Sequence, residues 1–164
     1  MDGEGIINII NRIDGLSFIF TGIYLNNYIP SHLMYRRNIF FIINTIENVE
    51  ENLIGHWLMF YIDEMHNLSF WDSYGLTPSA YFGAIAKFYS SYPYKKIIPI
   101  HRPHQQNSSM VCGIYVIFFA HNMFQNNSIR KIKSYFHCNR KKYDCLMLQY
   151  FYRLTGRSFK PMVT

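Results

Sequence analysis

The sequence HWLMFYIDEMHNLSFWD occupies residues 56–72, and in it two apolar runs enclose the mainly polar residues Asp63 to Asn67. Aromatic and other β-forming residues fill both runs, while the polar cluster between them is typical of a turn. The pattern predicts a β-hairpin centred near Glu64. Its open end brings His56 opposite Asp72, with Cβ atoms about 5 Å apart on one face. The same register pairs the interior residues Leu58 with Phe70 and Phe60 with Leu68.

Upstream of this hairpin, the sequence predicts one helix and one strand. Isoleucines at positions 6, 9, 10 and 13 recur at the spacing of one helix face, which indicates a short amphipathic helix over Gly5 to Ile13. The apolar run Phe40 to Thr45 predicts a buried strand, and the acidic run Glu47 to Glu51 after it predicts a surface loop. The stretch from Phe18 to Tyr28, followed by Pro30, is expected to be an irregular entry to the sheet.

Downstream of the hairpin, three helices and a strand are predicted. Thr77 and Pro78 resemble a helix start, and apolar residues at helical spacing continue to Tyr92. Ile97 to Ile100 predicts an edge strand, because Pro99 has no N–H for a ladder. Val111 to Phe124 is apolar all round, as in a buried helix, and Lys141 to Leu154 predicts an amphipathic helix. These elements predict an α+β fold in which a small mixed sheet packs on a central buried helix.

Length and composition suit one domain, residues 1–164, with no membrane span. A chain of this length, 49% hydrophobic and 18% aromatic, can bury about two thirds of its unfolded surface. The longest apolar stretch, Val111 to Ala120, is shorter than the ~20 residues that cross a bilayer, and the N-terminus lacks the basic start of a signal peptide. From these features we expect an intracellular protein that is not secreted. Three cysteines form an odd and sparse set, so we expect reduced thiols. The protein is expected to be a monomer.

The net charge of +6 is concentrated near the C-terminus. From residue 129 onward, nine Lys and Arg residues accompany one acid, giving +8 there and −2 in residues 1–128. A basic segment of this kind attracts polyanions, which makes DNA a candidate partner. A solvated helix face that keeps the protein soluble explains the same charge equally well. The candidate nucleic-acid contacts are Arg130, Lys131, Lys133, Arg140, Lys141 and Lys142.

Cys112, at the start of the predicted central helix, is a candidate nucleophile. A free thiol has a pKa of about 8.5, and a helix N-terminus or a nearby histidine activates it. His56 is the histidine that the predicted hairpin sets opposite an acid, so we expect His56 to be the base and Asp72 to orient it. The backbone amide of Cys112, with the side chain of Gln105 or Gln106, could form an oxyanion hole. Together these residues make one constellation of a thiol, a histidine, a carboxylate and amide donors.

These motifs occur in the order and spacing of a known family. The chain resembles the adenovirus protease (adenain) family of cysteine peptidases and, more widely, the clan of ubiquitin-like-protein proteases. The resemblance covers about residues 17–125 and leaves the basic segment 129–164 unmatched. It rests on Gly55-His56-Trp57, Trp71-Asp72-Ser73-Tyr74-Gly75, Gln105 and Ser109-Met110-Val111-Cys112-Gly113, supported by Phe41 to Thr45 and Phe20 to Tyr24.

The resemblance implies an adenain-like fold and a role for each motif residue. Cys112 takes the place of the nucleophile and His56 that of the base. Asp72 stands where the adenovirus enzymes usually carry glutamate and the wider clan aspartate. The adenovirus spacing places the oxyanion glutamine seven residues before the cysteine, at Gln105, whereas the wider clan favours six, at Gln106. We favour Gln105.

The resemblance also implies a cysteine endopeptidase that cleaves viral precursor and structural proteins during virion maturation. Such an enzyme acts in the virion and inside the host cell, above all in the nucleus. It uses no metal and has no obligatory cofactor, although DNA and a short viral peptide stimulate the adenovirus enzymes. No cysteine precedes Cys112, so the disulfide that tethers this peptide in adenoviruses has no evident partner here. Trp57 and Tyr74 would line the substrate groove.

Three alternatives remain at the level of sequence. A deubiquitinase-like or SUMO-protease-like isopeptidase would use the same triad on another substrate. An inactive, DNA-binding or capsid-associated protein is the second. A zinc site from His137, Cys138 and Cys145 is the third, but a fourth ligand and finger-like spacing are missing. His101 and His104, in the loop before the candidate nucleophile, are expected to face solvent or substrate.

Overall fold

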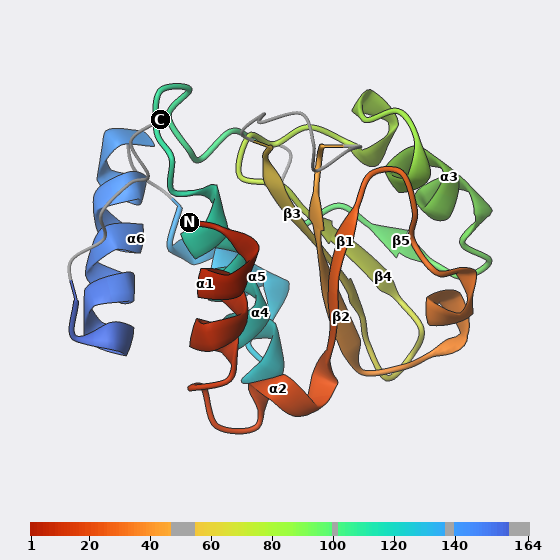
Figure 1. Ribbon diagram of the computed structural model, residues 1–164, viewed down its shortest axis with the longest axis horizontal. Helices are drawn as coiled ribbons and strands as arrows, with labels where there is room; N and C mark the ends of the chain where they lie inside the picture. Colours follow the sequence, from red (N-terminus) through yellow and green to blue (C-terminus); the bar gives the residue numbers. More distant parts are fainter. Residues whose placement is uncertain (47–54, 100–101, 137–139, 158–164) are drawn as a thin grey trace.

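The computed structural model describes residues 1–46, 55–99, 102–136 and 140–157, and it places helices on both faces of a five-stranded sheet (Figure 1). The acidic run 47–51 and Ile100 lie outside the described residues. The strands are β1 (Phe20–Leu25), β2 (Ile39–Asn44), β3 (Trp57–Ile62), β4 (Leu68–Trp71) and β5 (Lys96–Ile97). The helices are α1 (Gly3–Ile10), α2 (Leu16–Ile19), α3 (Ala84–Ser91), α4 (Cys112–Phe124), α5 (Ile129–Ser134) and α6 (Arg140–Thr155), with 3-10 turns η1 (Ser31–Tyr35) and η2 (Pro78–Ala80).

The sheet is mixed, and its spatial order β1-β2-β3-β4-β5 follows the chain. The central strands β2, β3 and β4 pair antiparallel, whereas β1 and β5 each pair parallel with their neighbours. Parallel pairs need a crossover, and the chain supplies one through η1 between β1 and β2 and another through η2 and α3 between β4 and β5. The α+β class predicted from the sequence is confirmed.

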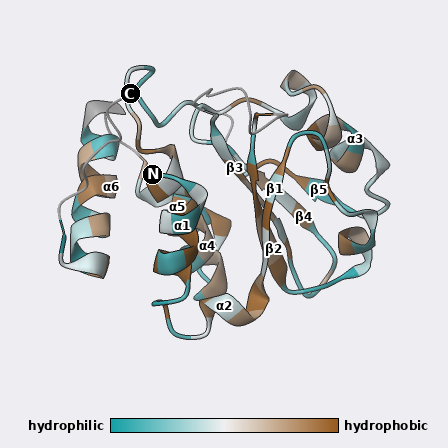
Figure 2. Ribbon diagram, viewed as in Figure 1, coloured by the Kyte–Doolittle hydropathy of each residue, from teal (hydrophilic) through white to brown (hydrophobic). Residues whose placement is uncertain are grey.

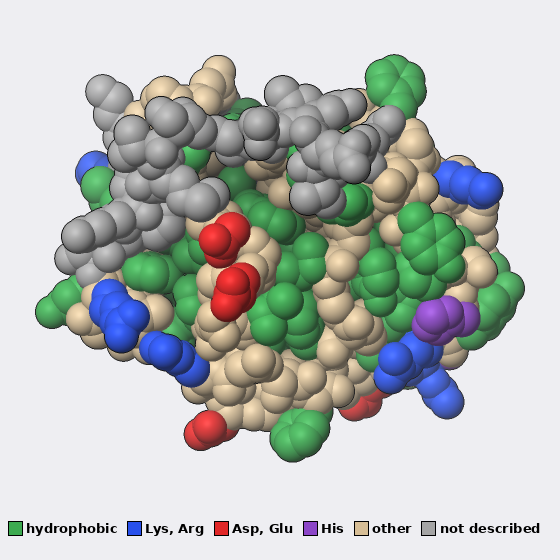
Figure 3. All heavy atoms as spheres, in the orientation of Figure 1, with side chains coloured by type: hydrophobic (Ala, Val, Ile, Leu, Met, Phe, Trp, Pro, Cys, Tyr) green, Lys and Arg blue, Asp and Glu red, His purple; other side chains and the backbone are tan. Residues whose placement is uncertain are grey.

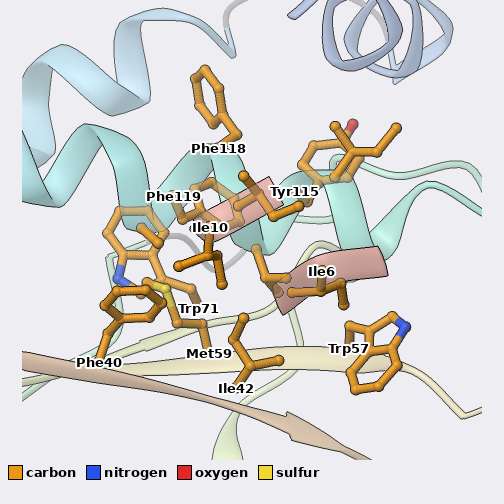
Figure 4. Close-up of a cluster of buried hydrophobic side chains, with 14 of the residues drawn as sticks. Ile6, Ile10, Phe40, Ile42, Trp57, Met59, Trp71, Tyr115, Phe118 and Phe119 are labelled. Carbon is orange, nitrogen blue, oxygen red and sulfur yellow. The ribbon is translucent and has the colours of Figure 1, made fainter. Parts of the chain in front are cut away.

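Residues of the central strands alternate between two hydrophobic cores. Phe40 and Ile42 of β2 face the core shared with α1 and α4, whereas Phe41 and Ile43 face the core shared with α3. Every residue of β2 and β3 is buried, because both faces of the sheet are covered. Figure 2 shows β2 and α4 as mainly hydrophobic, and Figure 4 shows side chains of α1 and α4 packed on the strands.

Helix α4 is the central helix that the sequence predicts. Its residues Ile114 to Ala120 are each at most 5% exposed. A helix that is apolar on all sides must be covered on all sides, and α4 contacts β3, α1 and α6. In Figure 1 the outer helix α6 lies on the side of α1 and α4 away from the sheet. At the N-terminus of α4, next to Cys112, a Cβ on Gly113 would lie 3.5 Å from the side chains of Ile6 and Trp57, so this end of the helix packs between α1 and β3.

The predicted hairpin is present, but it is centred on Met65, one residue later than expected. Asp63 caps the turn in this register: its carboxylate accepts the N–H groups of Met65 and Asn67, and its own N–H donates to the Asn67 carbonyl. The predicted pairs His56 with Asp72, Leu58 with Phe70 and Phe60 with Leu68 are therefore wrong. The observed pairs are Met59 with Trp71, Phe60 with Phe70, Tyr61 with Ser69 and Ile62 with Leu68. Because the pairing moves by two, every residue keeps its face, and His56 and Asp72 stay neighbours.

Two predictions for the N-terminal part were wrong in detail. The first helix begins at Gly3 rather than Gly5, because the side chain of Asp2 caps it by accepting the Gly5 N–H at 2.8 Å. It ends at Ile10 instead of Ile13. The stretch expected to be irregular contains β1, whose partly buried residues and register shift beside Phe20 hide the alternation of a strand.

The helix predicted from Thr77 is interrupted. η2 ends at Ala80, and α3 begins only at Ala84, after Gly83 at φ 75°. The N-terminus of α3 is held by Asn26, whose backbone and side-chain oxygens accept the N–H groups of Ala84 and Ile85. Because this cap comes from a residue far away in the sequence, local helix propensity does not predict the break between η2 and α3. Of the edge strand predicted over 97–100, only Ile97 lies in a strand, the short edge strand β5, whereas residues 98 and 99 are outside it.

The C-terminal segment folds as two helices. α6 agrees with the predicted helix 141–154 to within one residue at each end, and it stops before Gly156, which adopts φ 67°. α5 was not predicted, and its first turn is capped by the hydroxyl of Ser128, which accepts the Lys131 N–H at 3.2 Å. Among the described residues, none of the helices has the length and apolar character to span a bilayer.

Candidate active site

His56 lies at the entrance to β3, and the end of β2 fixes its backbone. Its N–H donates to the Thr45 hydroxyl at 2.8 Å, and its carbonyl accepts the Thr45 N–H at 3.0 Å. The preceding Gly55 permits this approach, because a Cβ there would lie 1.6 Å from Oδ1 of Asn44. These contacts with the end of β2 therefore fix the position of the His56 backbone, from which the imidazole extends.

Asp72 follows β4, and its carboxylate accepts four hydrogen bonds. Oδ1 accepts from His56 Nε2 at 2.6 Å and from the Tyr74 N–H at 2.8 Å. Oδ2 accepts from the Leu76 N–H at 2.8 Å and from the Tyr81 hydroxyl at 2.9 Å. The Asp72 side chain is only 1% exposed. Since the other three bonds oppose rotation of the carboxylate, it holds the imidazole in one orientation.

The His56 ring lies between this carboxylate and an aromatic face. The ring of Tyr74 stacks on it at 4.3 Å between centroids. Burial acts to lower the pKa of His56, but the hydrogen bond to Asp72 and the proximity of Cys112 raise it to about 9. Nε2 is bound to Asp72, whereas the buried Nδ1 has no nitrogen or oxygen partner within the described part of the chain. Nδ1 is therefore the nitrogen left for the thiol.

Cys112 is the first residue of α4, and its side chain is partly buried. Burial acts to raise the pKa of the thiol, but the interaction with His56 and hydrogen bonds from the backbone of Trp57 and Gly113 lower it below its ordinary value. The N-terminal end of the helix dipole acts in the same direction. The surroundings of Cys112 therefore favour a thiolate beside an imidazolium, the pair that makes a cysteine nucleophilic.

The two candidate glutamines have different partners. Gln105 is fully buried, its Oε1 accepts the Ser73 hydroxyl at 2.7 Å, and its N–H donates to the Ser73 carbonyl at 3.0 Å. Its Nε2 donates to the carbonyl of Ser109, in the turn that leads into α4. The Gln106 side chain instead donates to Asp144 of α6 at 3.1 Å. The structure thus brings Gln105, and not the side chain of Gln106, to the approach of α4.

The two candidate groove residues differ in accessibility. Trp57 is only 8% exposed, and its indole N–H donates to the carbonyl of Met1 at 3.0 Å. Its ring also packs against Gly113, so Trp57 supports the site from inside. Tyr74 is partly exposed and lies over His56, with its hydroxyl 3.5 Å from Nε2 of Gln105. Of the two, Tyr74 has the surface that a substrate could contact.

The candidate nucleic-acid contacts lie on the two C-terminal helices. Arg130, Lys131 and Lys133 are exposed on α5, and Lys142 is exposed on α6. The side chains of residues 140 and 141 lie outside what the structure describes. Among the described side chains on the face seen in Figure 3, Lys and Arg form separate groups near the left and right edges.

Other polar residues depart from expectation or fall outside the description. His104, expected to face solvent or substrate, is 4% exposed and stacks on Phe136 at 4.3 Å between ring centroids. His101, His137 and Cys138 lie outside the described residues. Within the described ranges, no group of three or more His, Cys, Asp or Glu side chains could hold a metal ion.

Sequence reasoning missed the residues that hold the candidates in place. Thr45 fixes the His56 backbone, Ser73 fixes Gln105, and Tyr81 binds Asp72. The position of Ser73 directly after Asp72 in the motif could have indicated its role. No sequence pattern pointed to Tyr81, because it was expected to belong to a continuous helix.

No model of a known protein family matches this chain, and no curated protein sequence is similar to it. The roles of the site residues rest on their geometry and on the sequence motifs.

Proposed function

We propose that this chain is a cysteine peptidase related to the adenovirus protease, with Cys112 as nucleophile, His56 as base and Asp72 as the residue that orients the base. One observation carries the proposal: the His56 ring is bound through Nε2 to a buried carboxylate at 2.6 Å, and its other nitrogen is left for a thiol whose pKa is lowered. A cysteine that only packs in a core is not expected to lie beside a histidine bound to a buried carboxylate.

The arrangement supports acyl transfer in two steps. The Cys112 thiolate forms a C–S bond with the scissile carbonyl carbon, and the carbonyl oxygen becomes an oxyanion near the Cys112 amide and the Gln105 side chain. The C–N bond then breaks, and the proton of the His56 imidazolium passes to the leaving amine. A water molecule gives a proton to His56 and attacks the acyl carbon, which releases the acid and restores the thiolate. Asp72 keeps the imidazole aligned throughout.

The proposed substrates are viral precursor and structural proteins, cleaved during virion maturation in the virion and the host nucleus. This part of the proposal rests on the resemblance to the adenovirus enzymes. DNA is a proposed activator, because exposed cations of α5 and α6 could contact phosphates. Absence of stimulation by DNA at every ionic strength would count against that role.

The central experiment is covalent labelling with a peptide that carries a thiol-reactive group at the scissile position. We expect stoichiometric labelling of the full chain and none in Cys112→Ala. Cys145 is an exposed free cysteine, so Cys145→Ala is the matched control and should label normally. Labelling that persists in Cys112→Ala and disappears in Cys145→Ala would show that the nucleophile was assigned wrongly.

Substrate class is tested separately. Ubiquitin-like conjugates and viral precursor proteins are offered to the same enzyme preparation, and the cleaved products are identified by mass. Cleavage of the conjugates alone would favour an isopeptidase with the same triad. A folded chain that neither labels nor cleaves would favour the DNA-binding or capsid-associated alternative.

A further inference from the structure

A buried carboxylate on the C-terminal helix connects two parts of the candidate site. Asp144 of α6 is 5% exposed. Its Oδ1 accepts the hydroxyl of Tyr115 at 3.0 Å. Its Oδ2 accepts the backbone N–H of Gln106 at 3.3 Å and the side-chain Nε2 of Gln106 at 3.1 Å. A buried carboxylate is stable only where hydrogen bonds offset the cost of removing it from water. These three contacts provide such bonds for Asp144.

The partners of Asp144 are next to the chemistry. Tyr115 is fully buried in α4, one helical turn after Cys112. Burial and the charge of Asp144 raise the pKa of Tyr115, which therefore stays a hydrogen-bond donor. Gln106 directly follows Gln105, the candidate oxyanion residue. One carboxylate thus ties the helix of the nucleophile to the loop of the oxyanion hole.

The other side of this loop is held by Ser73. The Ser73 carbonyl accepts the N–H groups of His104 at 2.7 Å and Gln105 at 3.0 Å. Gly75 lies so close to the loop that a Cβ there would be 2.5 Å from the backbone of Arg102. Ser73 therefore holds residues 104 and 105 of the loop, and Asp144 holds residue 106. Without Asp144, the backbone that follows Gln105 loses its anchor, and the position of the Gln105 amide depends on Ser73 and Ser109 alone.

We infer that Asp144 is a positioning residue for the oxyanion hole, acting through Gln106 on Gln105. The inference rests on the proposed function. It makes α6 part of the catalytic apparatus, although the helix lies in the outer layer (Figure 1) and beyond the stretch that resembles the adenovirus enzymes. A displacement of about 1 Å in a catalytic group can cost on the order of 100-fold in rate, so a small movement of this loop is sufficient to matter.

The test separates oxyanion stabilisation from thiol reactivity. Iodoacetamide alkylates Cys112 at a saturated carbon, so the reaction builds no oxyanion, whereas acylation by a peptide ester does. In Asp144→Asn we expect the alkylation rate and its pH profile to stay within about twofold of wild type. We expect kcat for the peptide ester to fall at least tenfold, with KM changed much less. Affinity for a peptide aldehyde, which forms a tetrahedral adduct with the thiol, should fall in parallel.

Three further variants serve as the control and as substitutes for Asp144→Asn. Asp63→Asn removes a turn-capping carboxylate at the far end of the hairpin and should leave both reactions unchanged. Tyr115→Phe and Gln106→Ala each remove one donor to Asp144, so they replace Asp144→Asn if that variant does not fold. Only the loss of the Gln106 donor should reproduce the defect in kcat.

Each result has a distinct meaning. Normal acylation of Asp144→Asn overturns the inference and leaves the proposed function intact. A parallel fall of alkylation and acylation also overturns it, since Asp144 would then support the fold or the nucleophile. A wild-type protein that is alkylated but never acylated overturns the proposed function itself.

Discussion

Asp72→Asn is the most informative substitution outside the nucleophile, because it keeps the shape of the side chain and removes its charge. Whichever oxygen becomes an amide nitrogen, one backbone donor, the N–H of Tyr74 or that of Leu76, then faces another donor, whereas the Tyr81 hydroxyl and the His56 ring can also accept. A buried donor without a partner costs about 1–3 kcal/mol. We expect a loss of about 1–3 kcal/mol in the free energy of unfolding, measured by denaturant titration.

The larger effect concerns the titration of His56 and Cys112. The pKa of His56 is raised from 6.5 to about 9, against burial that lowers it. This difference corresponds to about 3 kcal/mol in favour of the imidazolium, shared between Asp72 and Cys112. Without the carboxylate, the pKa of His56 falls, the imidazolium no longer stabilises the thiolate, and the pKa of Cys112 rises.

The assay is the rate of iodoacetamide alkylation against pH, in a chain whose other cysteines are replaced by serine. We expect wild type to react with a midpoint below the range of an ordinary thiol. Asp72→Asn should react at least tenfold more slowly at pH 6. Asp63→Asn is the matched control, because Asp63 caps only the distal turn. A folded Asp72→Asn protein with an unchanged pH profile would refute the assignment of the triad.

Three more predictions follow from the same contacts. Gly55→Ala should lower the free energy of unfolding by about 1–3 kcal/mol, because the new Cβ meets the Asn44 side chain. A double-mutant cycle checks this reason, since the loss should be smaller in an Asn44→Ala background. Ser73→Ala should reduce kcat more than it changes KM, because Gln105 loses the donor to its Oε1; an equal loss in alkylation rate would contradict this role. The kcat/KM of wild type should fall as the pH rises through about 9, where the imidazolium of His56 loses the proton destined for the leaving group; a decline that begins near pH 6.5 would show that its pKa is not raised.

Much of the fold could be predicted because it depends on local periodicity. The all-apolar run of α4 predicted a buried helix, and the two apolar runs 56–62 and 68–72 around a polar cluster predicted a hairpin. The break before α3 could not be predicted, because its cap comes from Asn26, far away in the sequence. That break has a consequence for the site: Tyr81 lies outside the helix and donates to Asp72.

For the candidate site, the motifs predicted the participants but not their arrangement. His56 and Asp72 were expected to be directly opposed, yet they meet diagonally, and Tyr74 stacks on the imidazole. Spacing alone left Gln105 and Gln106 as alternatives. Their contacts distinguish them, because Ser73 binds one and Asp144 the other.

Local patterns in the chain were sufficient to predict the buried faces of the strands and of α4, and the order of the chemical groups, because side-chain periodicity and motif spacing are properties of neighbouring residues. The tertiary structure alone decided the hairpin register, the capping of α3 by Asn26 and the contact of Asp144 with the loop of Gln105. These features depend on hydrogen bonds between residues far apart in the chain. Such bonds form only when the packed core has brought their partners together.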